Sequence, residues 1–191
     1  MKIKHCALLA FALMLLSACD NAPAPEQAII SEGGYTDVAS VKLETGKAAP
    51  DFKLQSLNGN WVQLSELRGN KVLMIFYRGH WCPFCVGHLQ DIQTMLPELE
   101  KRGYQVLAIS PDDATDMQKM ADRMDRPYQF LSDAGLKVSD IYGIRKDEEL
   151  PHPAMILLDD QGVVKWFYIG EDYKTRPSAE QLQKVLDRLD N

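Results

Sequence analysis

Residues 76–90 read FYRGHWCPFCVGHLQ and place two cysteines, Cys82 and Cys85, three positions apart directly after an apolar run. A proline lies between the cysteines, and a histidine lies on either side of the pair. This spacing suits a redox couple, half of a metal site, or two buried thiols. The rest of the sequence is needed to choose among these three uses of the cysteine pair.

The apolar run KVLMIFY, residues 71–77, predicts a central strand with both faces covered. Strand patterns and helix patterns alternate along the rest of the chain. We expect strands at 53–57, 61–64, 104–110, near 130, 154–158 and 163–168. We expect helices after the cysteines up to Gly103, after Asp113 to about Met124, at 136–142 and from Ser178. This order predicts an α/β fold with a mixed sheet between helices. A right-handed crossover then places Cys82 where a central strand ends and a helix begins, which is where open α/β sheets carry their chemistry.

A thiol at a helix N-terminus faces unpaired backbone N–H groups and the positive end of the helix dipole, both of which stabilise thiolate. Pro83 suits the first helical position. Cys85 lies on the same helix face as Cys82 and within disulfide reach. These residues predict that Cys82 attacks and that Cys85 resolves the mixed disulfide.

A metal site is the alternative use of the pair. Structural zinc needs four ligands, and the chain has no second C-x-x-C pair. A soft metal such as copper could bind both cysteines together with one of His80, His88 or His152.

The 191 residues are 46% apolar and carry a formal charge of −6. This suffices for one domain with a buried core. An acidic chain without a Lys/Arg stripe does not suit nucleic acid, whose phosphates require concentrated positive charge. We therefore expect no nucleic-acid partner.

The N-terminus, MKIKHCALLAFALMLLSAC, begins with basic residues and continues as an apolar run from Cys6 to Leu16. This run is shorter than the ~20 residues that span a bilayer, and a short apolar run after a basic start is typical of an export signal. The end of the segment resembles the lipobox of bacterial lipoproteins. The resemblance implies a signal peptide over 1–18 and acyl chains on Cys19, which would anchor the protein to a lipid bilayer.

That anchor predicts a place in the bacterial cell envelope, facing the periplasm or the extracytoplasmic side. Asp20 resembles an inner-membrane retention signal. Cleavage removes Cys6 and the lipid blocks Cys19, so only Cys82 and Cys85 remain as thiols. Residues 19–45, rich in Ala, Pro and small polar residues at their start, are expected to be the lipidated cysteine and a flexible tether, and 46–191 to be the single domain.

The segment from Gly46 to Cys85 is similar to the opening of the redoxin and peroxiredoxin (AhpC/TSA) branch of the thioredoxin-like superfamily, and its RGxWCPxC pattern is close to that of a peroxiredoxin-like subgroup. The likeness continues through VLAISPDD (106–113), LPHPAMILLDDQGVV (150–164) and DYKTRPS (172–178). It implies a thioredoxin-like three-layer fold, in which helices flank a central mixed β-sheet that has an N-terminal β-hairpin extension.

The resemblance supports two assignments. Compared with thiol-disulfide reductases, Cys82 matches the nucleophile of WCxxC and Pro153 matches the cis-proline beside the disulfide, with a trans proline at the start of a strand as the alternative. Compared with peroxiredoxins, Cys85 matches the peroxidatic cysteine and Cys82 the hydroxyl residue of the motif. In that alignment Arg78 replaces the motif's proline, and Pro153 lies about where the peroxide-polarising arginine would be.

Four other residues are candidates near the pair. His88 could move a proton when Cys85 attacks, or be a solvated helix residue. His80 could stabilise thiolate, and Arg78 could pair with a carboxylate or lie over Trp81. Trp81 is expected to cover the disulfide or to pack in the core.

The sequence thus predicts a membrane-anchored thiol-disulfide oxidoreductase that acts on protein disulfides and takes electrons from a membrane thiol carrier. The first alternative is a peroxidase acting on peroxide, with Cys85 or Cys82 peroxidatic and oxidised to sulfenic acid. The second is a copper or soft-metal carrier. No flavin or nicotinamide fingerprint is present in the sequence, and we expect no cofactor.

Overall fold

The computed structural model describes residues 25–191, which form an eight-stranded mixed sheet with the strand order β1-β8-β7-β4-β5-β6-β2-β3. Strand β4 lies at the centre, parallel to β5 and antiparallel to β7. The strands are β1 (Gly34–Thr36), β2 (Lys53–Ser56), β3 (Trp61–Gln63), β4 (Lys71–Phe76), β5 (Tyr104–Ser110), β6 (Gln129–Ser132), β7 (Ala154–Leu158) and β8 (Val164–Ile169).

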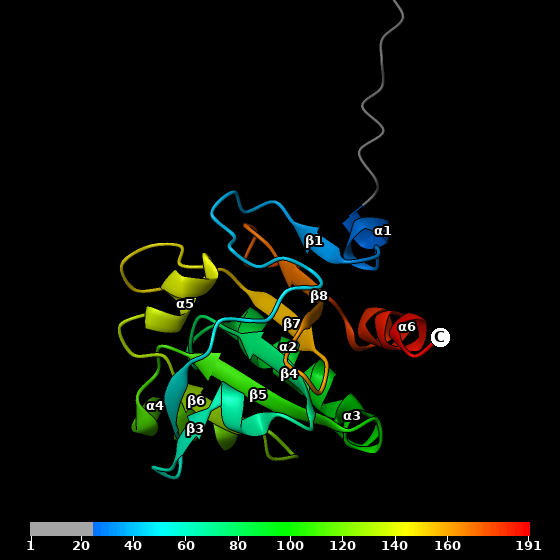
Figure 1. Cartoon of the computed structure of the whole chain (residues 1–191). Coiled ribbons are helices and arrows are strands. Elements are labelled where there is room, and N and C mark those ends of the chain that lie inside the picture. The colour runs from blue at the N-terminus through cyan, green and yellow to red at the C-terminus, as the bar shows by residue number, and fades with distance from the viewer. Residues whose placement is uncertain (1–24) are drawn as a thin grey trace, which may run out of the picture.

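Helices cover both faces of this sheet, with α3 and α6 on one side and α5 on the other (Figure 1). The α-helices are α1 (Pro25–Ile29), α2 (Pro83–Ile92), α3 (Leu96–Lys101), α4 (Ala114–Ala121), α5 (Lys137–Tyr142) and α6 (Ala179–Leu189). Two 3-10 turns, η1 (Leu64–Leu67) and η2 (Gln93–Met95), complete the elements. The predicted three-layer α/β fold is confirmed.

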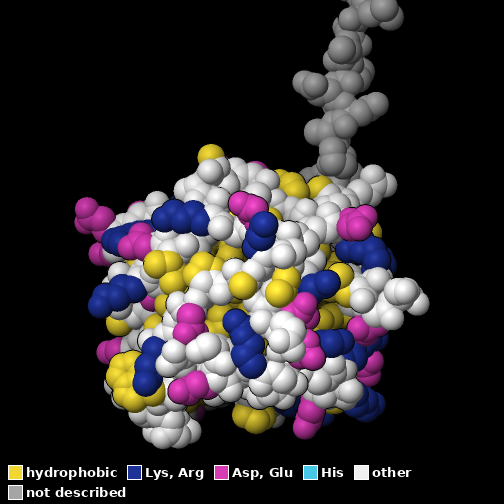
Figure 2. Space-filling model, in the orientation of Figure 1, with side chains coloured by type: hydrophobic (Ala, Val, Ile, Leu, Met, Phe, Trp, Pro, Cys, Tyr) yellow, Lys and Arg dark blue, Asp and Glu magenta, His cyan; other side chains and the backbone are white. Residues whose placement is uncertain are grey.

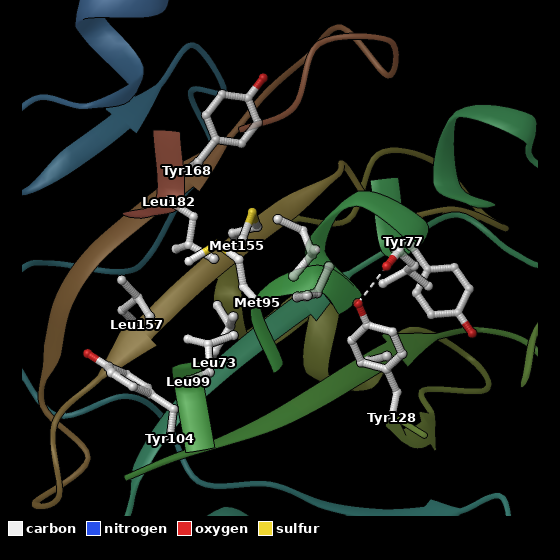
Figure 3. Close-up of a cluster of buried hydrophobic side chains, with 14 of the residues drawn as sticks. Leu73, Tyr77, Met95, Leu99, Tyr104, Tyr128, Met155, Leu157, Tyr168 and Leu182 are labelled. Atoms are coloured by element: carbon white, nitrogen blue, oxygen red, sulfur yellow. Dashed lines mark hydrogen bonds between the residues drawn. The ribbon is translucent and has the colours of Figure 1, made fainter. Parts of the chain in front are cut away.

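Strand β4 separates two hydrophobic cores because its side chains alternate between the faces of the sheet. Leu73 and Ile75 pack with α2, α3 and α6, whereas Met74 and Phe76 pack with α5 and the β2–β3 hairpin. Figure 3 shows the first of these cores, in which the Tyr128 hydroxyl donates to the carbonyl of Leu89 in α2. Helix α2 is thus fixed to the sheet along its buried side.

The cysteine-bearing helix is shorter than the one expected to run from the cysteines to Gly103. It begins at Pro83, immediately after Cys82, as expected, but gives way at Gln93–Met95 to a 3-10 turn before α3. Pro97 explains the break, since a proline lacks the N–H that a continuous helix would use and is tolerated in the first turn of a new one. The result is a short helix that begins directly after Cys82 and carries Cys85 in its first turn.

The segment expected to be a flexible tether is in part packed on the domain. Ile29 is buried, its carbonyl accepts from the Trp166 indole N–H at 3.2 Å, and β1 pairs in parallel with β8. The apolar residues at 28–30 account for the difference, because they cover part of the core beside the open edge of β8. The predicted signal peptide and lipidated Cys19 lie outside the described residues.

Charged side chains of both signs are interspersed over the face of the domain drawn in Figure 2. This distribution agrees with an acidic protein that carries no basic stripe on this face. Within residues 25–191, no helix has the length and apolarity needed to cross a membrane.

Candidate functional site

The cysteine turn, residues 77–82, connects the end of β4 to the start of α2. Gly79 has a φ of 152°, and a Cβ at this position would lie 2.6 Å from the Trp81 indole nitrogen and 3.0 Å from a carboxylate oxygen of Asp112. Only glycine fits such a close approach. Cys82 is the N-cap of α2 and Pro83 its first residue, so the predicted placement of the pair at a strand end and helix start is confirmed.

Both cysteines are reduced and buried, with 1% of Cys82 and none of Cys85 exposed. The Cys85 N–H donates to the Cys82 carbonyl at 3.0 Å, in the first turn of α2. The pair therefore lies under the surface, on the first turn of the helix.

Arg176 is the charged residue closest to Cys85. Its Nη2 lies 3.3 Å from the Cys85 Sγ, within hydrogen-bond distance of a sulfur acceptor. Burial raises the pKa of the Cys85 thiol, while the Arg176 guanidinium and the Arg78 backbone N–H oppose that rise. Cys85 therefore depends on Arg176 for the stability of any thiolate that it forms.

Arg176 comes from the arginine segment, residues 171–178, which connects β8 to α6. A groove of about 450 Å³ separates this segment from α2, and Phe84, His88 and Arg176 are among the residues that line it. The groove reaches the guanidinium that contacts Cys85. It is a route by which a small molecule could approach the site.

Aromatic side chains surround the entrance. The Arg78 guanidinium lies 5.0 Å from the Trp81 ring centre and 4.5 Å from that of Tyr173, and Phe84 meets Tyr173 edge-on at 5.6 Å. Trp81 and Phe84 are about half exposed. Of the two positions considered for Arg78, the structure shows the one over Trp81.

His88 lies one helical turn beyond Cys85, and its Nε2 is 3.0 Å from the carbonyl of Pro177. Burial and the neighbouring Arg176 lower the pKa of His88 well below its ordinary value. The imidazole is therefore neutral, and Nε2–H donates to the carbonyl. A histidine held in this way is poorly suited to proton transfer, one of the two roles considered for it from the sequence, and its contact with Pro177 also distinguishes it from a freely solvated side chain.

A second polar cluster lies on the other side of the cysteine turn. The His80 N–H donates to buried Asp112 at 2.8 Å, and His80 Nδ1 is 3.7 Å from Asp116. Among the described residues this is the only set of three metal-ligating side chains that come within reach of one another, and neither cysteine belongs to it. The structure gives no support to a copper carrier built on the cysteine pair.

Pro153 requires a correction, because the expected cis bond is not found and every peptide bond among residues 25–191 is trans. Pro153 directly precedes β7, whose first residue, Ala154, pairs with Phe76 at the end of β4. The alternative of a trans proline opening this strand is the one observed. The adjacent His152 is buried and donates its backbone N–H to Ile144.

Four buried side-chain atoms in the described part of the chain have no hydrogen-bond partner: Tyr77 Oη, Arg78 Nε, His152 Nδ1 and Arg176 Nε. Tyr77 lies close enough to Cys85 for a thiolate there to raise the tyrosine pKa, although burial is the larger cause. Because buried polar groups are normally paired, the unpaired Arg176 Nε and Tyr77 Oη near Cys85 are groups to which a small polar molecule could hydrogen bond.

Sequence reasoning had not identified Arg176, Asp112 or Tyr77 as site residues. Arg176 was within the quoted DYKTRPS segment, but no spacing rule indicates that a residue 91 positions away reaches Cys85. Asp112 follows β5, and parallel pairing with β4 brings the ends of these strands together.

Comparisons with known proteins agree with this geometry. The AhpC/TSA family matches residues 45–167. Chloroplastic peroxiredoxin Q of Oryza sativa subsp. japonica is 30% identical over 182 residues, which cover 94% of this chain and 83% of the relative. Chloroplastic peroxiredoxin Q of Arabidopsis thaliana is 32% identical over 159 residues, covering 82% and 73% of the two chains.

Solved structures support the fold. Peroxidoxin BcpB of Mycobacterium tuberculosis superposes with a TM-score of 0.66 at 23% identity, covering 78% of this chain and 97% of that one. Reduced 2-Cys peroxiredoxin of Plasmodium vivax gives a TM-score of 0.69 at 20% identity, with 76% and 96% covered. The chain is a thiol-dependent oxidoreductase and belongs to the AhpC/TSA family.

Proposed function

We propose that this protein is a thiol peroxidase in which Cys85 attacks the peroxide and Cys82 resolves the product. The contact of 3.3 Å between Arg176 Nη2 and Cys85 Sγ carries the proposal. A guanidinium there stabilises the attacking thiolate and can polarise the peroxide oxygens as charge develops on them. The similarity to peroxiredoxins supports the same assignment.

In the first step the Cys85 thiolate forms an S–O bond with one peroxide oxygen while the O–O bond breaks. The departing oxygen takes a proton and leaves as water or an alcohol, and Cys85 becomes a sulfenic acid. In the second step the Cys82 sulfur attacks Cys85, the S–O bond breaks, and water leaves. The cysteine pair has then lost two electrons, and an external thiol reductant must return them.

The sequence analysis favoured Cys82 as the nucleophile for a protein disulfide. Attack on a protein substrate requires that the sulfur meet a bulky disulfide, yet Cys82 is 1% exposed. A peroxide is small enough to use the groove beside Arg176. Burial thus favours peroxide as the substrate and Cys85, which contacts the arginine, as the nucleophile.

A stopped-flow experiment tests the proposal. The reduced protein is mixed with hydrogen peroxide, and tryptophan fluorescence reports oxidation beside Trp81. We expect a rate constant far above that of free cysteine, kept in Cys82→Ser and lowered at least ~1000-fold in Cys85→Ser. A wild-type rate equal to that of free cysteine, or a fast phase that depends on Cys82 instead, would refute the assignment.

We also propose that acyl chains on Cys19 anchor the enzyme to the extracytoplasmic face of a bacterial membrane, within reach of a membrane thiol reductant. The lipobox-like sequence at residues 16–19 supports this location. Changing Cys19 to Ser should move the protein from the membrane fraction to the soluble fraction. Unchanged fractionation together with an unmodified Cys19 by mass spectrometry would exclude the anchor.

A further inference from the structure

We infer that His88 and Asp91 are positioning residues through which α2 holds Arg176 against Cys85. The inference rests on the proposed function and names the groups that place its arginine. Cys85, His88 and Asp91 follow one another at intervals of three positions, so they lie along one side of α2. The same helix therefore carries both the sulfur and the groups that hold its cation.

Two hydrogen bonds connect α2 to the arginine segment and to the helix that follows it. His88 Nε2 lies 3.0 Å from the carbonyl of Pro177, the residue after Arg176. The Asp91 Oδ2 accepts the Ala179 N–H at 2.7 Å, at the first residue of α6. These contacts fall on both sides of Ser178, so α2 holds the end of the arginine segment at two points.

The rest of the segment is fixed largely by its own contacts, although Tyr173 also meets Phe84 of α2 edge-on, and Arg176 Nη1 donates to the Tyr173 carbonyl. The Tyr168 hydroxyl donates to the Thr175 carbonyl at 2.8 Å, and Asp172 accepts from the Lys174 N–H and the Thr175 hydroxyl. Ser178 and Gln181 form a capping box at the start of α6. The segment thus has its own internal structure, and the His88 and Asp91 hydrogen bonds, together with the Phe84–Tyr173 contact, set its position relative to the cysteine helix.

His88 performs this role as a neutral donor. Burial and, to a smaller extent, the nearby Arg176 guanidinium disfavour a charged imidazole and lower the pKa of His88. The groups that face Cys85 are Arg176 from the arginine segment, Cys82 and the Arg78 N–H from the cysteine turn, and Tyr77 after β4. Of these groups, only Arg176 comes from a segment that is distant in sequence from the cysteine turn.

The consequence concerns the reactivity of Cys85. The interaction between two charges falls as they separate and as water enters between them. Without the Pro177 contact, Arg176 should sample positions farther from Cys85 Sγ. The Cys85 thiolate then loses stabilisation although both residues remain in the protein.

The test measures the pKa of Cys85 in a Cys82→Ser background, from the pH dependence of iodoacetamide alkylation. His88→Ala should raise this pKa by about one unit and slow peroxide oxidation by ~10- to 100-fold. His88→Gln, whose amide N–H can still reach the Pro177 carbonyl, should recover most of the loss. Asp91→Asn should give a smaller shift in the same direction.

A double-mutant cycle separates positioning from general damage to the fold. If His88 acts through Arg176, then His88→Ala should have little further effect in an Arg176→Gln protein. Gln90→Ala, an exposed change on the same helix, is the matched control and should leave the Cys85 pKa unchanged. Circular dichroism and thermal melting confirm that each variant is folded.

Two outcomes would overturn the inference: an unchanged Cys85 pKa in folded His88→Ala, or fully additive effects of His88→Ala and Arg176→Gln. Alkylation requires no peroxide, so it tests the positioning role even if the wild-type protein proves slow with hydrogen peroxide. A slow wild-type reaction would contradict only the proposed peroxidase function.

Discussion

The two sides of the cysteine turn carry opposite charge. On one side Arg176 contacts Cys85, and on the other Asp112 and Asp116 approach His80. Both sides lie at the same strand ends, so topology alone does not distinguish them. The difference shows that the sheet provides the location, whereas loops from distant parts of the chain decide which sulfur has a cation beside it.

The largest effect should come from removing the charge on the arginine side. Arg176→Gln keeps polar atoms but removes the charge, and we expect the peroxide rate constant to fall by ~10²- to 10³-fold, the usual loss for one transition-state donor. The Cys85 pKa should rise, since Arg176 is the main group opposing burial. Stopped-flow kinetics and alkylation measure the two effects.

Arg176→Lys sharpens the same comparison. A lysine keeps the charge but lacks the planar fork of an arginine, so its rate should lie between those of the wild type and Arg176→Gln. A rate for Arg176→Gln within a few-fold of the wild type would mean that the contact with Cys85 is structural and that the two sides of the turn do not differ in function.

A change at Asp112, on the acidic side of the turn, should affect the free energy of unfolding more than the peroxide rate constant. Buried Asp112 accepts the His80 N–H at 2.8 Å, and Asp112→Ala would leave this donor without a partner. We expect a loss of ~1–3 kcal/mol in the free energy of unfolding, measured by urea denaturation, with a peroxide rate within a few-fold of the wild type. A rate loss as large as that of Arg176→Gln would place Asp112 in the chemistry.

Asp112→Asn tests the acidic side through the pH dependence of stability. Burial raises the pKa of Asp112, so the folded state favours its protonated form. In the wild type, the free energy of unfolding should therefore fall as the pH rises from the ordinary aspartate pKa through the raised pKa of Asp112. Relative to the wild type, Asp112→Asn should be more stable at pH 7 than at pH 4 in urea denaturation, and the opposite trend would contradict the assignment.

The sequence predicted most of the elements because they depend on local patterns. The apolar run 71–77 corresponds to β4, and the strands expected at 53–57 and 61–64 correspond to the β2–β3 hairpin. Cys82 and Cys85 were identified from spacing and from their place before a helix. These features involve neighbouring residues, which a linear pattern can show.

The remaining parts of the site depend on contacts that no linear pattern contains. The family alignment indicated that Pro153 replaces an arginine, but it could not show that Arg176 approaches from the segment after β8. The sequence left His88 as either a proton carrier or a solvated helix residue, and neither alternative included its contact with the Pro177 carbonyl. Ile29 lay in a polar stretch, and the open edge of β8 made it part of the core.

The smallest effect should come from a change in α2, the helix that follows the cysteine turn. Gly87 is exposed within α2, and a Cβ there would meet nothing within 4 Å. Gly87→Ala should therefore stabilise the fold by ~0.5–1 kcal/mol, because alanine loses less conformational entropy than glycine in a helix. Urea denaturation measures the gain, and the peroxide rate should not change. Gly87 also lines the groove beside Arg176. A slower peroxide reaction in Gly87→Ala would therefore show that the peroxide reaches the site through this groove, along α2.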